Sequence, residues 1–186
     1  YRIVTDPYTG VEGYPPLSVS AHAVYCSHHH FDHDAVGCVT ILSPVPSPFA
    51  VREVATCHDE QGGALRGPNT VRVFTAGGVS VAHLGDLGHQ LTAEQLSAIG
   101  SVDAVLVPVG GVYTVDAAGA KAVCDAIGAR CVIPMHYHHA PYGLPNVAGV
   151  EDFLALWPAD AVCRLSGPSF EVTAETTGVL VPAFLA

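Results

Sequence analysis

Short apolar runs, rich in β-branched residues and bounded by turn residues, recur along the whole chain. Runs of this length and composition are typical of β-strands. Two of them, TVRVFTA and VSVAHL, are separated only by Gly77 and Gly78. A Gly-Gly pair supplies the positive φ angles of a tight turn, so these two runs predict a hairpin. The predicted strands span residues 2–6, 23–27, 38–42, 51–56, 70–76, 79–84, 103–109, 131–134, 161–165 and 179–185.

Helical signals are confined to the second half of the chain. Thr92 and Gln95 have the spacing of a capping box, and Gly100 follows at a position suited to a left-handed stop. An alanine-rich run over 114–128 predicts a second helix, and 150–157 predicts a third. Strands first, followed by alternating strands and helices, indicate a layered α/β fold.

The length and composition favour one domain over residues 1–186. The chain has 186 residues, of which 49% are hydrophobic. A chain of this size typically buries about 70% of its unfolded surface, which is enough for one continuous core. The proline-rich segment 43–49 is interpreted as a surface loop and not as a linker between domains.

The charge pattern argues against nucleic-acid binding. The formal net charge is −10, and Lys121 is the single lysine. Proteins that bind nucleic acid need a basic surface that contacts phosphates, which this composition does not offer. No apolar run reaches the roughly 20 residues of a membrane span, and the first residues have no leader pattern. We therefore expect a cytoplasmic protein; the oligomeric state cannot be read from the sequence.

Histidine is the unusual feature of the composition. The chain has eleven histidines, many of them in the segments SHHHFDHD and PMHYHHAP. Clustered histidine usually indicates metal binding. The six cysteines show no C-x-x-C spacing, so a zinc ribbon or a redox pair is not expected.

The first cluster follows a predicted strand and has the spacing of metal ligands. His28 and His30 alternate, so their rings should lie on one side and hold one ion, while Asp32 and His33 turn toward a neighbouring position. One loop cannot complete two sites, because a zinc ion takes about four ligands. Further candidate ligands lie at the ends of other predicted strands: His58, Asp86 and His136.

The order of four motifs resembles the metallo-β-lactamase superfamily. These motifs are HHHFDH, CHDEQGG with LRGPN, HLGDLGH, and IPMHY. The sequence is most similar to the branch that includes L-ascorbate-6-phosphate lactonase and related metal-dependent hydrolases. The resemblance covers nearly the whole chain and implies the αββα sandwich fold of that superfamily.

The resemblance also implies a role for each matched residue. His28, His30 and His58 would hold a first divalent metal ion, Asp32, His33 and His136 a second, and Asp86 would bridge both ions. The nitrogen-rich first site favours Zn²⁺, although Mn²⁺ and Fe²⁺ also occupy mixed nitrogen and oxygen sites. Asp32 and Asp86 are the implied catalytic residues.

The sequence departs from the family pattern in three places. Relatives usually begin with one more strand, which carries Gly-His-Ser near the pocket, and this chain starts about one hairpin later. Either the chain is a fragment or the fold is trimmed, so the first sheet is expected to lack that strand. Further differences are His138 and His139 after the last motif, and His22 where relatives tend to have an acidic residue.

The implied activity is hydrolysis of a small anionic ester or lactone. Two metal ions would share a hydroxide that attacks the substrate, and Asp32 would orient it. Arg66 either holds an anionic group of the substrate or clamps its own loop through Asp59 or Glu60. His89 either lines the pocket with a substrate role or is structural, whereas His29 and His83 are expected to be solvated or packed.

Three other functions share parts of this pattern. A phosphodiesterase acting on a lipid or nucleotide phosphodiester would use the same ligands, and the sequence does not separate it from the leading hypothesis. A non-catalytic metal-binding domain is a further alternative. A di-iron redox protein is disfavoured because relatives of that kind usually carry Glu where this chain has His30, and β-lactam hydrolysis is disfavoured because no cysteine is among the matched ligands.

Overall fold

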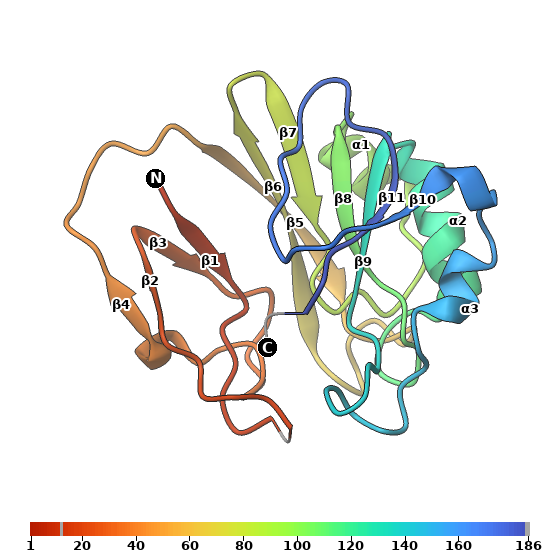
Figure 1. Cartoon of the computed structure of the whole chain (residues 1–186), viewed down its shortest axis with the longest axis horizontal. Coiled ribbons are helices and arrows are strands. Elements are labelled where there is room, and N and C mark those ends of the chain that lie inside the picture. Colours follow the sequence, from red (N-terminus) through yellow and green to blue (C-terminus); the bar gives the residue numbers. More distant parts are fainter. Residues whose placement is uncertain (12, 185–186) are drawn as a thin grey trace.

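A computed structural model describes residues 1–11 and 13–184, and a seven-stranded sheet forms its centre (Figure 1). The three strands at one edge run antiparallel, and the remaining pairs are parallel. In their order across the sheet, the strands are β10 (Val162–Arg164), β11 (Gly178–Val181), β9 (Cys131–Met135), β8 (Ala104–Pro108), β7 (Val79–His83), β6 (Pro68–Ala76) and β5 (Ala50–Cys57).

The predicted hairpin joins β6 to β7. Ala76 pairs with Val79, and the two residues between them, Gly77 and Gly78, have φ angles of 57° and 82°. Residues other than glycine reach such angles only with strain, so the Gly-Gly pair determines the tight turn.

Three helices cover one face of the sheet, and the N-terminal strands lie on its other side (Figure 1). Helix α1 (Ala93–Ile99) begins with the predicted capping box: the Thr92 side chain accepts a hydrogen bond from the Gln95 backbone N–H, and the Gln95 side chain accepts one from Thr92. Gly100 follows the helix with φ 66°. The other helices are α2 (Ala117–Ile127) and α3 (Glu151–Leu154).

Two predicted helix boundaries are wrong by a few residues. Helix α2 starts after Asp116 and not after Thr114, because the Asp116 carboxylate accepts a hydrogen bond from the Gly119 N–H at 2.8 Å and so caps the first turn. Helix α3 ends at Leu154, and the chain continues to Trp157 in turns. The short 3₁₀ helix η2 (Ala159–Ala161) precedes β10.

The main core lies between the sheet and the helices. Val105, Val123 and Phe153 are almost fully buried there, from β8, α2 and α3 respectively. A smaller cluster, which includes Ile133 and Leu180, lies apart from the main core, and Val172 of the C-terminal segment packs against it. Burial on both sides explains why the central parallel strands β8 and β9 are apolar throughout, without a polar alternation.

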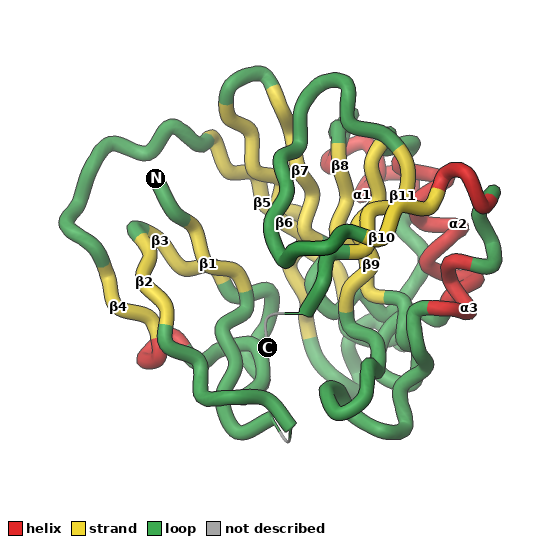
Figure 2. The backbone as a smooth tube through the Cα atoms, viewed as in Figure 1, coloured by secondary structure: helices red, strands yellow, loops and turns green. Residues whose placement is uncertain are grey.

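The N-terminal quarter is mostly loop and contains two small parallel pairs of strands (Figure 2). β1 (Ile3–Thr5) pairs with β3 (Ala23–Tyr25), and β2 (Val19–Ala21) pairs with β4 (Val39–Ile41), which follows the 3₁₀ helix η1 (Val36–Cys38). Strand β2 was not predicted, because its three residues include only one large apolar side chain. The prediction of a mixed α/β fold with a central sheet is confirmed. Among the described residues, the N-terminal strands form these two separate pairs and not one continuous sheet.

The longest helix in the described part of the chain, α2, has only 11 residues, and none of the helices there is long and apolar enough to cross a membrane.

Candidate metal centre

The seven predicted ligands come from loops at the ends of four strands. His28, His30, Asp32 and His33 follow β3, whereas the other three follow β5, β7 and β9. Strands β5, β7 and β9 run in the same direction, because two antiparallel pairings separate β5 from β7. Their carboxyl ends therefore meet at one edge of the sheet, which is the usual place for a site in such sheets.

Asp86 lies at the centre of the cluster. Its Oδ2 atom is 3.2 Å from His58 Nε2, 3.3 Å from His136 Nε2, 3.5 Å from His33 Nε2 and 3.9 Å from His28 Nε2. The residue is only 3% exposed. Four imidazole nitrogens thus converge on one buried carboxylate oxygen.

Two groups of possible ligand atoms can be distinguished. His28, His30 and His58 have ligand atoms within 4.8 Å of one another, and so do His28, His33 and Asp86. His28 therefore belongs to both groups. The carboxylate of Asp32 is 3.8 Å from His33 Nε2. The structure brings all seven predicted residues into one region; the division of ligands between two metal ions stays a prediction.

The hydrogen bonds of His28 prepare it to bind a cation. The Ser27 hydroxyl donates to Asp6 Oδ2 at 2.7 Å, so it accepts from His28 Nδ1 at 2.9 Å. With its proton on Nδ1, the neutral ring carries a bare lone pair on Nε2. This Nε2 is buried and has no hydrogen-bond partner among the described residues. A buried acceptor without a donor fits a metal ligand.

His58 shows the same preparation. Its Nδ1 lies 3.0 Å from the Tyr113 carbonyl oxygen, which can only accept, so Nδ1 carries the proton. The lone pair of Nε2 then faces Asp86 Oδ2 at 3.2 Å. Two acceptors at this distance repel each other unless a proton or a cation lies between them. The donor set therefore fits divalent metal ions.

The pKa values of the cluster reflect burial and crowded charges. Burial lowers the pKa of His28 to about 4. Burial also acts on His33, but the carboxylates of Asp6, Asp86 and Asp32 outweigh it and raise the pKa of His33 to about 8. The neighbouring His136 and His33 hold the pKa of Asp86 well below its usual range, despite burial. This low pKa keeps Asp86 anionic near neutral pH, as a carboxylate metal ligand requires.

Asn69 and Gly85 position Asp86, and sequence analysis did not identify them. The Asn69 side-chain oxygen accepts a hydrogen bond from the Asp86 backbone N–H at 3.0 Å, and its amide donates to the Leu84 carbonyl. Gly85 has φ 56°, and a Cβ atom there would lie 2.4 Å from both Asn69 Oδ1 and Ser27 Cβ. Only glycine fits between these groups. Asn69 ends the LRGPN motif, so the motif itself was the available signal.

His136 has a strained backbone. Its φ angle is 54°, a left-handed conformation that residues with a Cβ atom rarely adopt. Gly110 passes so close that a Cβ atom there would lie 2.3 Å from the His136 carbonyl oxygen. Strain of this kind persists where the surrounding structure imposes it, and it often marks functional sites.

Asp6 is a further residue that sequence analysis missed. Its carboxylate accepts from the Ser27 backbone N–H and hydroxyl, and it lies 3.3 Å from His33 Nδ1. Its own φ angle is 46°. Asp6 thus links His33 with the Ser27–His28 hydrogen bond. The signal in the sequence was an acidic residue at the end of the predicted strand 2–6.

We expect Asp6→Asn to weaken metal binding by about 10- to 100-fold, because the residues that hydrogen-bond to metal-ligating histidines orient them and raise their basicity. Titration calorimetry with Zn²⁺ measures this change. Asp34→Asn is the matched control, since Asp34 pairs with the exposed ring of His29 on the same loop. Equal affinity of the Asp6 variant and the unaltered protein would contradict the role assigned to Asp6.

Two of the other histidines make local contacts. His29 points outward and pairs with Asp34 at 2.6 Å. His89 Nε2 accepts a hydrogen bond from the Cys57 backbone N–H, and its Nδ1 donates to the Gln90 carbonyl. Both nitrogens of His89 are therefore engaged with backbone, which favours the structural role.

The histidines that depart from the family pattern also have partners. His22 accepts from the Arg2 backbone N–H at 2.9 Å. His139 stacks on Phe184 with 4.4 Å between ring centroids, and His138 lies near the Gly143 carbonyl. His83 is buried, with Nδ1 4.0 Å from Asp6 Oδ2. None of these contacts reaches Asp86 directly.

Arg66 clamps two loops together. Its guanidinium donates to the Val112 carbonyl at 3.1 Å and lies over the Tyr113 ring. The predicted partner Asp59 instead accepts hydrogen bonds from backbone N–H groups of its loop, including that of Arg66. These contacts favour the structural role of Arg66 over substrate binding. The guanidinium, however, holds Val112 and Tyr113 and not the expected Asp59 or Glu60.

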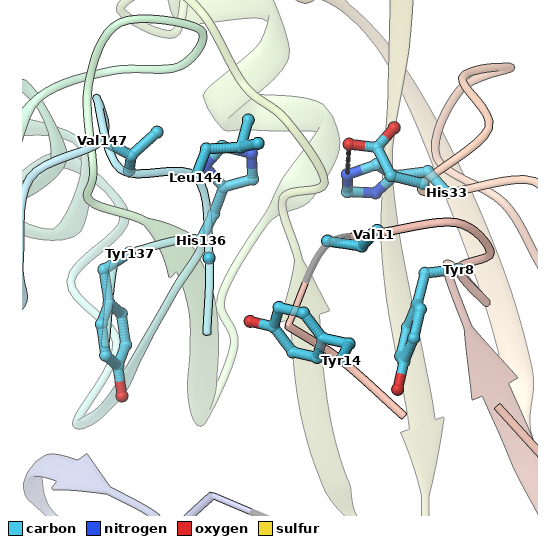
Figure 3. Close-up of a pocket in the computed structure, with 10 residues that line it drawn as sticks. Tyr8, Val11, Tyr14, His33, His136, Tyr137, Leu144 and Val147 are labelled. Atoms are coloured by element: carbon cyan, nitrogen blue, oxygen red, sulfur yellow. Dashed lines mark ion pairs between the residues drawn. The ribbon is translucent and has the colours of Figure 1, made fainter. Parts of the chain in front are cut away.

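A cavity of about 170 Å³ opens beside the cluster (Figure 3). Asp32, His33 and His136 form one of its walls. Tyr8, Val11 and Tyr14 supply part of the remaining walls, and the loop 137–147 supplies the rest. A small molecule in this cavity would contact the candidate ligands directly.

Comparison with protein families gives one extended match. The Beta-lactamase superfamily domain matches residues 1–136. A metal-dependent hydrolase of Archaeoglobus fulgidus is 27% identical over 179 residues, which is 75% of this chain and 78% of that protein. A metal-dependent hydrolase of Methanoculleus marisnigri is 33% identical over 122 residues, which is 65% of this chain and 54% of that protein.

Solved structures show the same similarity. A candidate Zn-dependent hydrolase of the metallo-β-lactamase superfamily from Thermotoga maritima is 34% identical, with a TM-score of 0.70 over 97% of this chain and 88% of that chain. A metal-dependent hydrolase from Parabacteroides distasonis, at 12% identity, shares the fold with a TM-score of 0.59 over 97% and 84% of the two chains.

Proposed function

This chain belongs to the metallo-β-lactamase superfamily, and on that premise we propose that it is a metal-dependent hydrolase that cleaves a small anionic ester or lactone. One observation carries the proposal. The Nε2 atoms of His28, His33, His58 and His136 all lie within 3.9 Å of Asp86 Oδ2, and no donor among the described residues satisfies the buried His28 Nε2.

The proposed ligand sets follow the resemblance. His28, His30 and His58 hold the first ion, Asp32, His33 and His136 hold the second, and Asp86 contacts both. This division is supported by the grouping of His28, His30 and His58. Histidine nitrogens favour Zn²⁺ for the first ion.

When bound, two divalent ions would lower the pKa of a shared water and polarise the carbonyl group of the substrate. The residues of the chain supply the rest. Asp32 lines the cavity with a partly exposed carboxylate, so it can orient the attacking water and accept its proton. As the oxygen of the water bonds to the carbonyl carbon, the ester C–O bond breaks, and the proton passes to the leaving oxygen.

The charge of the site favours an anionic substrate. Two divalent ions would bring four positive charges, and Asp32, Asp86 and the shared hydroxide would balance three of them. One positive charge remains within a protein of formal net charge −10. An anionic group of the substrate would be attracted to this charge at short range.

The test is hydrolysis by the metal-loaded chain. We expect turnover of lactones or aryl esters with Zn²⁺ or Mn²⁺, loss of turnover with a chelator, and recovery when the metal is restored. Spectrophotometric assays with a panel of lactones, aryl esters and phosphodiesters measure the rate of turnover in each state. Turnover of phosphodiesters alone would favour a phosphodiesterase, and full metal content without any turnover would favour a non-catalytic metal-binding domain.

A further inference from the structure

The cavity beside the metal centre has two chemically different sides. The acidic and histidine residues Asp32, His33 and His136 lie on one side. Figure 3 shows the rings of Tyr8, Tyr14 and Tyr137 across this space, and Leu144 and Val147 near His136. Val11 also lines the cavity. No lysine or arginine is among the described residues that line the cavity.

The tyrosines supply neutral ring surface. Burial raises the pKa of Tyr14 and also that of Tyr137, so both phenols stay uncharged near neutral pH. The Tyr8 hydroxyl already donates to the Pro15 carbonyl at 3.1 Å. What these side chains offer a ligand is therefore mainly apolar and aromatic contact area.

Contacts among the aromatic rings hold this wall in place. The ring of Tyr14 lies 5.3 Å from that of Tyr8 and 5.2 Å from that of Tyr142, between ring centroids. Gly13 approaches the other loop so closely that a Cβ atom there would lie 2.4 Å from the Pro141 carbonyl oxygen. The two loops thus form a preformed wall, which lowers the entropy cost of binding.

The size of the cavity suits one ring. Its volume is about 170 Å³. An apolar cavity of about 150 Å³ in another protein binds benzene. A phosphate, by contrast, is usually held by cationic side chains, and the described residues that line the cavity include no lysine or arginine.

We infer that this cavity is the subsite for an uncharged, ring-sized apolar part of the substrate, so that the substrate combines an ester or lactone at the metal side with an aryl or alicyclic group. This inference rests on the proposed function and narrows it. The anionic group of the substrate then lies toward the metal side, and the apolar group lies between the two loops. Phosphorylated sugar lactones do not match this arrangement.

The binding test uses the metal-loaded full chain and does not depend on turnover. We expect phenylacetate to bind about tenfold more tightly than acetate, because its ring would leave water for the cavity. Calorimetry or ligand-observed NMR measures both affinities. Leu144→Asp, which places a charge in the cavity wall, should remove the difference, whereas the control Leu156→Asp, at an exposed leucine that does not line the cavity, should keep it. Equal affinity for acetate and phenylacetate in the unaltered protein would overturn the inference.

The kinetic test separates this inference from the proposed function. For γ-butyrolactone and its phenyl-substituted analogue, we expect the phenyl compound to have the higher kcat/KM, with Leu144→Asp removing the preference while metal content is unchanged. Turnover of both lactones without a preference, or a preference for a phosphorylated sugar lactone, would overturn the subsite and leave the hydrolase intact. Selective binding of phenylacetate without any turnover would support the subsite and contradict the hydrolase.

Discussion

Asp86→Ala is expected to remove bound metal and to reduce kcat/KM by about 10³-fold or more, since metal-ion catalysis contributes several kcal/mol of transition-state stabilisation. The physical reason is geometry. Four histidine Nε2 atoms surround Asp86 Oδ2 at 3.2 to 3.9 Å, so under the proposed division of ligands Asp86 would contact both ions. Elemental analysis of the purified variant gives the metal content per chain, and the lactone or ester assay gives the rate.

Two further variants make the Asp86 result specific. Asp103→Asn is the matched control, because Asp103 precedes β8 at the opposite edge of the sheet and pairs with Arg130. It should keep both metal and activity. Asp86→Asn keeps the size of the side chain but loses the charge, so it should bind metal more weakly than the unaltered protein. An Asp86→Ala variant with a full metal complement would show that Asp86 is not a ligand.

Removing the metal is expected to lower the Tm of the protein by about 10 °C. A ligand that binds only the folded state at 1,000 times its Kd stabilises that state by about 4 kcal/mol. For a domain of this size, each kcal/mol shifts Tm by roughly 2–4 °C. Without cations, the crowded His33, His58 and Asp86 side chains must be held together by protons alone. Thermal unfolding monitored by circular dichroism, before and after dialysis against a chelator, measures the shift.

The same chelator experiment on Asp86→Ala serves as its control. That variant should show little change in Tm, because it has no tightly bound metal to lose. A Tm unaffected by chelation in the unaltered protein, with metal content confirmed to fall, would mean that the metal does not contribute to the folded state. Recovery of Tm on adding Zn²⁺ would show that the change is reversible.

Several features of the fold follow directly from local sequence. Each of the ten predicted strands overlaps a strand in the structure, and the capping box at Thr92 starts a helix as expected. The last of them, predicted over 179–185, ends at Val181, and residue 185 lies outside the described residues. These signals are local, because a strand needs only a short apolar run and a cap needs only two side chains three residues apart. The start of α2 was missed because Thr114 and Asp116 are both good capping residues, and the hydrogen bond to Gly119 decides between them.

By itself, the sequence determined the strands, the mixed α/β class and the seven side chains at strand ends that the family resemblance selects, since each of these depends on residue type and spacing. Only the tertiary structure shows that Asp6 and Asn69 contact the cluster. It also shows that both nitrogens of His89 bond to backbone groups and that a tyrosine-lined cavity lies beside His136. The reason is that these relations join residues far apart in the chain, whose distances depend on how the loops pack against the sheet.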